Sequence, residues 1–294
     1  VIVATISKGQ NDYQTREFEA YTSSLTELRD WCKSQGVTHV AMESTGVYWK
    51  PVFNILEEDF EIILVNARHV KNVPGHKTDK RDSRWISKLL LAGLLRGSFI
   101  PPRDIRELRD LVRYKKRQVE HVASEKNRLI RILEDANIKL STVLTEVHGA
   151  TGSKIINDII DGKTNVDDLM KHIHGKVKAN REDIRKALEG KLTAHHRFML
   201  NIIRKSIEEK EGIIGELEQH IDRATAQYAV EIDLLQTIDG VGKDSAISII
   251  SEIGVDMNQF PNEHHLSSWA GLSPGNNESA GKKKAQGQLR ETAT

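Results

Sequence analysis

Two acidic residues three positions apart, Asp79 and Asp82, are surrounded by cations in the run Lys77-Thr78-Asp79-Lys80-Arg81-Asp82-Ser83. Carboxylates bind hard cations such as Mg²⁺, and two such ions about 3.5–4 Å apart activate the attacking and leaving oxygens of a phosphodiester. The flanking Lys77, Lys80 and Arg81 would hold the phosphate backbone. These residue types suit the metal site of an enzyme that cuts nucleic acid, although a salt-bridged surface helix has the same composition.

A third acid, Glu43, ends a short apolar and β-branched segment, 37–42, that predicts a buried strand. A second strand of this kind is predicted over 61–66, and a helix is predicted over 79–96. An acid at the carboxyl end of a strand lies where the sites of helix-covered sheets usually form. Because Asp79 and Asp82 share one side of the first helical turn, we expect all three carboxylates to meet at a sheet edge.

The segments 1–6 and 15–20 are β-prone and flank a polar turn, which predicts a β-hairpin. With helices expected over 24–35 and 48–58, the chain begins with an α/β domain whose single sheet has strands in mixed directions. Pro101 and Pro102 mark the end of this first domain, 1–102.

Apolar residues then recur in steps of four and three from Leu108 to Val147, Val119 among them, and a second series runs from Leu200 to Tyr228. The two series predict long helices that pack as an antiparallel coiled coil in a second domain, 103–229. A polar helical insert is expected between them, at about 153–192. The helices form either a bundle within one chain or a contact between chains.

The third domain, 230–294, is expected to be small and α-helical. Gly240, Gly242 and Lys243 lie in a tight turn before an isoleucine-rich helix, as in a helix-hairpin-helix element whose glycine amides approach a DNA phosphate. A helix-capping turn without a ligand is the alternative.

Near the end of the chain, Ser279 stands just before Lys282, Lys283 and Lys284. Its hydroxyl could approach a phosphate whose charge the lysines offset, but a serine is a weak nucleophile until a base or a metal helps it. A basic loop with an incidental serine is the alternative.

Composition adds limits. The 294 residues carry a formal net charge of only +1, so basic character is local, at 68–88, 113–117 and 282–284. A single cysteine, Cys32, excludes a disulfide framework and a Cys-rich zinc site and suits a reducing cytoplasm. No apolar stretch approaches the roughly 18 residues of a membrane span. The neighbouring histidines lack a complete set of zinc ligands; they are His172 with His174, His195 with His196, and His264 with His265.

Glu43-Ser44-Thr45-Gly46-Val47-Tyr48-Trp49 and the run from Lys77 to Asp82 resemble the N-terminal motifs of the transposases of the one-ten family of insertion sequences. The resemblance implies a RuvC-like, ribonuclease-H-type first domain with Asp, Glu, Asp and Asp as metal ligands. Glu43, Asp79 and Asp82 match the last three. The first Asp is expected shortly before the family's counterpart of Val1, and this chain, which begins without an initiator Met, does not contain it. Asp12, in the hairpin turn, does not match it.

The segment from Trp269 to Lys284 resembles the C-terminal domain of the same family, in which a serine before a Gly-Lys pair attacks DNA. Ser279 matches that serine better than Ser273 does. The resemblance implies an Mg²⁺-dependent recombinase that joins donor and target DNA through a phosphoserine link. It also implies a structured bridge RNA that selects the DNA, a homodimer or homotetramer joined through the long helices, and a place in a prokaryotic cytoplasm, on the nucleoid when active.

The chain departs from the family pattern after Ala285, where a Lys-Gly-Asn segment is expected and Gln286-Gly287-Gln288 stands instead. Further helical sequence is expected beyond Thr294. Two other functions stay open: a structure-selective nuclease or junction resolvase that uses the carboxylates alone, and a non-catalytic DNA-binding scaffold built on the coiled coil and the hairpin element.

Overall fold

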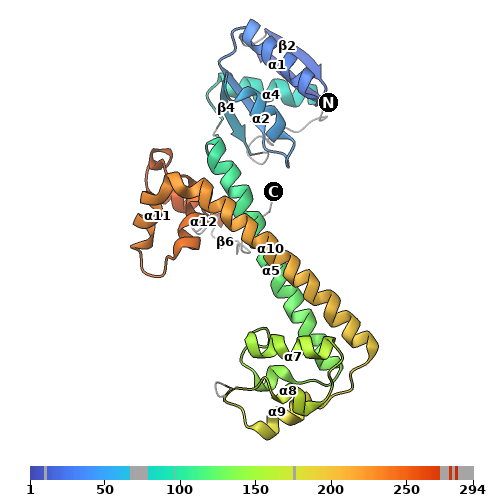
Figure 1. Cartoon of the computed structure of the whole chain (residues 1–294). Helices are drawn as coiled ribbons and strands as arrows, with labels where there is room; N and C mark the ends of the chain where they lie inside the picture. Colours follow the sequence, from blue (N-terminus) through green and yellow to red (C-terminus); the bar gives the residue numbers. More distant parts are fainter. Residues whose placement is uncertain are drawn as a thin grey trace. The chain divides into compact units, whose positions relative to one another are not determined.

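The computed structural model describes residues 1–9, 12–66, 79–95, 97–174 and 177–271, together with the backbone of 278–279 and 282–283. The protein is mostly helical, with small sheets and long helices (Figure 1). Two compact units are present, one made of Val1–Ile100 and Asp256–Thr294 and the other of Pro101–Val255. None of the helices within the described ranges is long and apolar enough to cross a membrane.

The predicted hairpin is confirmed: β1 (Ile2–Ser7) and β2 (Tyr13–Phe18) pair antiparallel, with Ile2 opposite Phe18. Successive side chains of each strand point to opposite sides, so the hairpin has two faces. One face joins a core with Leu25 and Leu28 of α1 (Thr22–Ser34). The other face bears hydroxyl groups and lies against α4 (Asp79–Leu91). The hairpin is therefore covered by helices on both sides.

The two predicted buried strands are also present, as β3 (His39–Glu43) and β4 (Glu61–Val65), and they pair in parallel around α2 (Trp49–Leu56). Leu56 and Phe60 bury them against the same core as the hairpin. The expected single sheet is not what forms in the described residues, because the hairpin and the parallel pair remain separate two-stranded sheets.

The predicted helix over 79–96 ends early, at Leu91. Gly93 has a φ of 65°, in the left-handed region that interrupts a right-handed helix. The same unit contains η2 (Met257–Gln259) and α13 (Glu263–Trp269). Their flanking rings Phe260 and Trp269 contact Phe99 at centroid distances of 5.4 and 6.2 Å, which joins this C-terminal segment to the chain just after α4.

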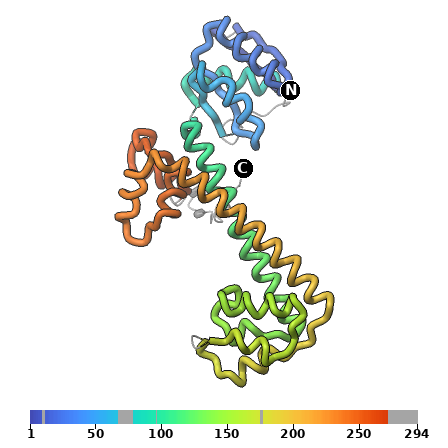
Figure 2. Tube along the Cα trace, in the orientation of Figure 1, coloured from blue at the N-terminus to red at the C-terminus, as the bar shows by residue number. Residues whose placement is uncertain are grey.

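Two long helices form the frame of the second unit: α5 (Arg103–Asp135) and α10 (Ala194–Thr225) run side by side (Figure 2). They are antiparallel, because Lys126 pairs with Glu211 at 2.8 Å while Lys115, earlier in α5, pairs with Glu218 at 2.9 Å, later in α10. Lys115 and Lys126 thus each form an ion pair between the two helices.

Two details of the apolar series were wrong. The first helix stops at Asp135 instead of continuing to Val147, since Asn137 adopts a φ of 60° and the chain turns. Val119, which the series placed in the buried stripe of α5, is 48% exposed, and the neighbouring Gln118 is buried in its place, with 7% exposed.

The segment between the long helices contains α6 (Leu140–Val143), α7 (Ala150–Ile160), α8 (Val166–Met170) and α9 (Arg181–Leu188). It was expected to be polar, but Ile155 and Ile159 are completely buried in a core shared with α5 and α10. At the other end, η1 (Ala226–Tyr228), α11 (Ala229–Gln236) and α12 (Lys243–Ile253) bury Ile247 and Ile250 against Leu108 of α5.

Candidate active site

A chain of hydroxyl groups fixes the first turns of α4 on the hairpin. Thr5 Oγ1 lies 2.8 Å from Ser83 Oγ and 3.0 Å from Thr15 Oγ1. Successive residues of a helix are rotated by about 100°. Because Ser83 faces β1, Asp82 therefore lies on one flank of α4 and Lys80 lies on the other. Asp79 is exposed and Asp82 is half-buried, both in the first turn, so solvent reaches the two carboxylates.

Glu43 lies where the sequence predicted it, as the last residue of β3. Thr45 Oγ1 donates to Glu43 Oε1 at 2.7 Å, which orients the carboxylate, and the Ser44 N–H donates to the Val65 carbonyl at 2.9 Å. The chain then reverses at Gly46, whose φ of 53° a residue with a Cβ adopts only with strain. Since α4 also contacts β3, the helix that carries the two aspartates borders the strand that carries Glu43.

The three carboxylates do not close into one metal site within the ranges described above, because no three Asp, Glu, His or Cys side chains there are grouped closely enough to hold an ion. Their chemistry nonetheless fits Mg²⁺, which takes oxygen ligands and is usually held by one or two carboxylates together with waters and substrate phosphates. Asp79 and Asp82, one turn apart at the start of a helix, are such a pair.

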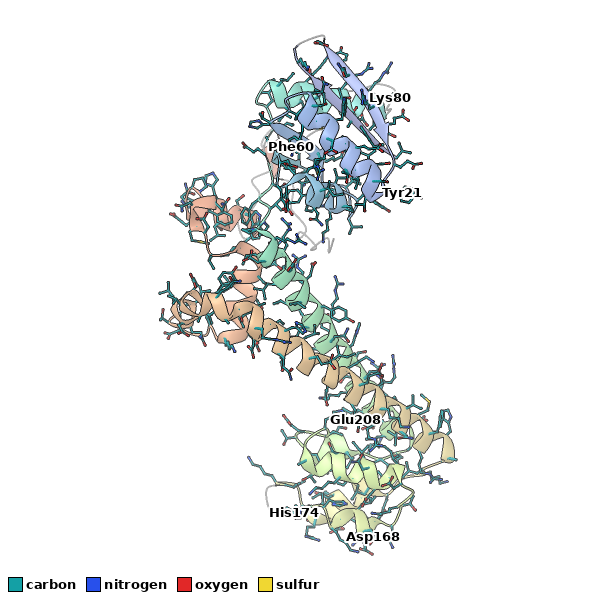
Figure 3. All side chains as sticks on the ribbon, turned by 45° about the horizontal axis from the view of Figure 1, so that its top comes forward. Tyr21, Phe60, Lys80, Asp168, His174 and Glu208 are labelled. Atoms are coloured by element: carbon teal, nitrogen blue, oxygen red, sulfur yellow. The ribbon has the colours of Figure 1, made fainter. Side chains whose placement is uncertain are left out.

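The predicted phosphate-binding cations have different surroundings. Lys80, labelled in Figure 3, pairs with Glu17 of β2 at 2.7 Å, and this hydrogen bond lowers the pKa of the Glu17 carboxyl. Arg81 is exposed on α4, and Lys77 lies outside the described residues. Arg84 and Lys88 belong to the basic stretch 68–88 but were not named among the predicted phosphate contacts, and both lie over the Tyr13 ring.

The glycine turn leads into α12 as expected. Gly240 has a φ of 85°, Gly242 is the N-cap of α12, and both are exposed with open space where a Cβ would stand. No side chain of the described residues caps this helix start, so its first N–H groups face outward, where an anion is favoured. Lys243 pairs with Asp222 of α10 at 2.7 Å, which raises the pKa of the lysine and holds it beside the turn.

Ser279 belongs to a short backbone pair. Strand β5 (Glu278–Ser279) pairs antiparallel with β6 (Lys282–Lys283), and Ser279 is directly opposite Lys282. The backbone therefore sets the predicted nucleophile across from one of the predicted cations. Lys284 lies outside the described residues.

Comparison with known protein families gives two matches that together span more than half of the chain. Residues 2–138 match a DEDD-type transposase family of IS110 elements, and residues 232–293 match the transposase family of IS116, IS110 and IS902 elements. The chain belongs to the IS110 family of transposases. It is a DNA transposase or recombinase, as the two sequence motifs predicted. No curated protein matches the chain.

Proposed function

We propose that this IS110-family transposase cuts and rejoins DNA through a phosphoserine intermediate at Ser279, assisted by Mg²⁺ at Glu43, Asp79 and Asp82. The observation that carries the proposal is the start of α4. Asp79 and Asp82 occupy one solvent-accessible turn that is tied to β1 by the Thr5–Ser83 contact, and α4 borders the strand that ends in Glu43. In a RuvC-like fold, to which we assign this first domain, acids at such strand and helix ends hold the metal.

In the proposed reaction, the Oγ of Ser279 forms a bond to phosphorus while the bond from phosphorus to one sugar oxygen breaks. The serine proton passes to a base and a proton is delivered to the leaving sugar oxygen, so the released DNA end carries a sugar hydroxyl. A second DNA end reverses the step and frees the serine, so that strands are exchanged without net hydrolysis. Mg²⁺, when bound, polarises the phosphoryl oxygens and favours the deprotonated serine.

The chain's own residues would orient the DNA. Thr45 holds the Glu43 carboxylate through its 2.7 Å hydrogen bond, and the β5–β6 pairing sets Lys282 opposite Ser279. The backbone amides at Gly240 and Gly242, with Lys243, would take a phosphate at the start of α12. Lys77, Lys80, Arg81, Lys283 and Lys284 complete the proposed phosphate contacts.

We further propose that a structured bridge RNA selects donor and target DNA, which leaves the protein to bind backbone and shape. A homodimer or homotetramer joined through α5 and α10 would bring two DNA partners together. Three domains would divide these tasks: 1–102 would carry the carboxylates, 103–229 would join the subunits, and 230–294 would carry the serine.

Strand transfer between labelled donor and target duplexes tests this function in the full-length protein with Mg²⁺, with and without the element's RNA. Asp79→Ala and Asp82→Ala should each abolish product, whereas Lys186→Ala, an exposed residue paired with Glu182, should leave it unchanged. Product formed at the wild-type rate by both aspartate variants would contradict the carboxylate site. Cleavage that survives Ser279→Ala would favour a nuclease that uses the carboxylates alone.

A further inference from the structure

We propose that the flank of α4 that faces β2 is a second nucleic-acid surface, which binds a phosphate backbone through Lys80, Arg84 and Lys88 away from the carboxylates. The inference rests on the proposed function, in that the enzyme must hold nucleic acid while another part of the chain cuts it. Lys80, Arg84 and Lys88 recur every fourth residue of α4, so they form one row about 6 Å apart along the helix.

The row lies on the opposite flank of α4 from Asp82. Ser83 Oγ, 2.8 Å from Thr5 Oγ1, marks the side of the helix that faces the hairpin. Lys80 is rotated from Ser83 toward β2, where it reaches Glu17, and Asp82 is rotated the other way. A strand bound along Arg84 and Lys88 would therefore be held rather than cut, while Lys80, also among the proposed contacts of the cut DNA, lies where the row begins.

Aromatic and hydroxyl groups hold the two outer cations of the row. The Arg84 guanidinium carbon lies 5.1 Å from the centre of the Tyr13 ring, and Arg84 Nε donates to Thr15 Oγ1 at 3.2 Å. Lys88 Nζ lies 5.6 Å from the centre of the same ring. A ring attracts a cation through its quadrupole but leaves the positive charge unneutralised.

Like charges four residues apart in such a row repel one another. Within the described residues, neither Arg84 nor Lys88 forms an ion pair, whereas Lys115 and Lys126 of α5 each pair with a glutamate. Lys80 has Glu17, but both side chains are more than half exposed, and an exposed pair of this kind exchanges readily. The fold thus fixes three cations beside one carboxylate, an arrangement that an external polyanion would stabilise.

The chemistry of the row fits phosphate oxygens and not bases. Arg84 offers a planar fork of donors and the lysines offer point charges. The Tyr13 ring already carries the Arg84 and Lys88 contacts, so a base would have to displace a cation in order to stack on it. Binding should therefore be independent of sequence and strongly dependent on salt, as backbone contacts are. Both DNA and a structured RNA present this chemistry.

The test compares Arg84→Gln/Lys88→Gln with Lys171→Gln/Lys186→Gln in the full-length protein. The control removes the same charge from lysines that pair with Asp168 and Glu182. Affinity is measured against salt for a short DNA duplex and for an RNA hairpin, both of unrelated sequence. For the duplex, loss of two phosphate contacts should make the slope of log affinity against log salt less steep by about 1.8. The control should keep the wild-type slope.

If the slope becomes shallower for the DNA probe alone, the row binds DNA. If it becomes shallower for the RNA probe alone, the row binds RNA. A shallower slope for both probes means that the row binds either backbone. A slope equal to that of the control on both probes would overturn the proposal. A cooperative thermal unfolding transition of the double variant above the assay temperature establishes that the change in slope is measured on folded protein. Failure of the proposed function has a different readout: strand transfer would survive Ser279→Ala, while the difference in salt slope between Arg84→Gln/Lys88→Gln and the wild type would still be measured.

Discussion

Arg109 of α5 fastens the C-terminal end of α12, and Arg109→Met tests how much that contact contributes. Arg109 Nε donates to the Ser251 carbonyl at 3.0 Å, and Nη2 donates to the Glu252 carbonyl at 2.6 Å. Nε also lies 3.2 Å from the Glu252 carboxylate, and the side chain is only 19% exposed. Burial lowers the pKa of Arg109, opposed by the Glu252 charge. The guanidinium thus caps the last carbonyls of α12, whose other end is the glycine turn.

The magnitude follows from what the substitution removes. Methionine keeps most of the apolar stem but loses two hydrogen bonds from a charged donor, each about 1.5 kcal/mol or more. Glu252 is not left unpaired, because Arg113 donates to both of its carboxylate oxygens at 2.8 and 3.0 Å. We therefore expect the free energy of unfolding to fall by about 3 kcal/mol or more.

Urea unfolding of the full-length protein, followed by circular dichroism, measures this change, with Arg103→Met as the control in the same helix. Arg103 pairs with Glu107 four residues on, with both side chains about 70% exposed, so its loss should cost about 0.5 kcal/mol or less. If Arg109→Met were no more destabilising than Arg103→Met, the capping argument would be refuted.

Three other outcomes are expected. Gly152→Ala should destabilise the protein by at least about 2 kcal/mol, since the new Cβ would lie 1.9 Å from the Val147 carbonyl oxygen. Gly212→Ala, in open space on α10, should stabilise it by up to about 1 kcal/mol. The midpoints of urea unfolding measure both changes in stability. Burial raises the pKa of the Cys32 thiol from 9.0 to about 11. The folded state therefore favours the neutral thiol, and this stability is fully present below pH 9.0 and lost as pH rises through about 11. Cys32→Ala should remove that alkaline loss from melts recorded across this range. Thr5→Val should lower strand transfer, because it breaks the contact that seats Ser83, and wild-type rates would contradict that role.

Local patterns were sufficient to predict the hairpin, both buried strands and the start of α4. Alternation in β1 and apolar runs in β3 and β4 depend on neighbours in the sequence, and the structure confirms each of them. The helical spacing of Asp79 and Asp82 likewise predicted that both would lie in the first turn of α4. Their metal-binding role stays a prediction.

Contacts between segments that are distant in the sequence could not be predicted from local patterns. Tyr13 and Arg84 meet only because α4 lies across the hairpin, and nothing in either segment signals the other. The apolar series in α5 also failed to indicate that Gln118 would be buried in place of Val119. Burial there is decided by how α5 and its neighbours pack, and heptad spacing does not contain that information.

The measurement that bears most directly on the central claim is the identity of the residue joined to DNA. The full-length protein, with the element's RNA and Mg²⁺, is incubated with a donor duplex, denatured and digested, and the DNA-linked peptide is sequenced by mass spectrometry. We predict that the link maps to Ser279 and that Ser279→Ala yields no linked peptide. A link at another residue, or one that persists in Ser279→Ala, would contradict the account.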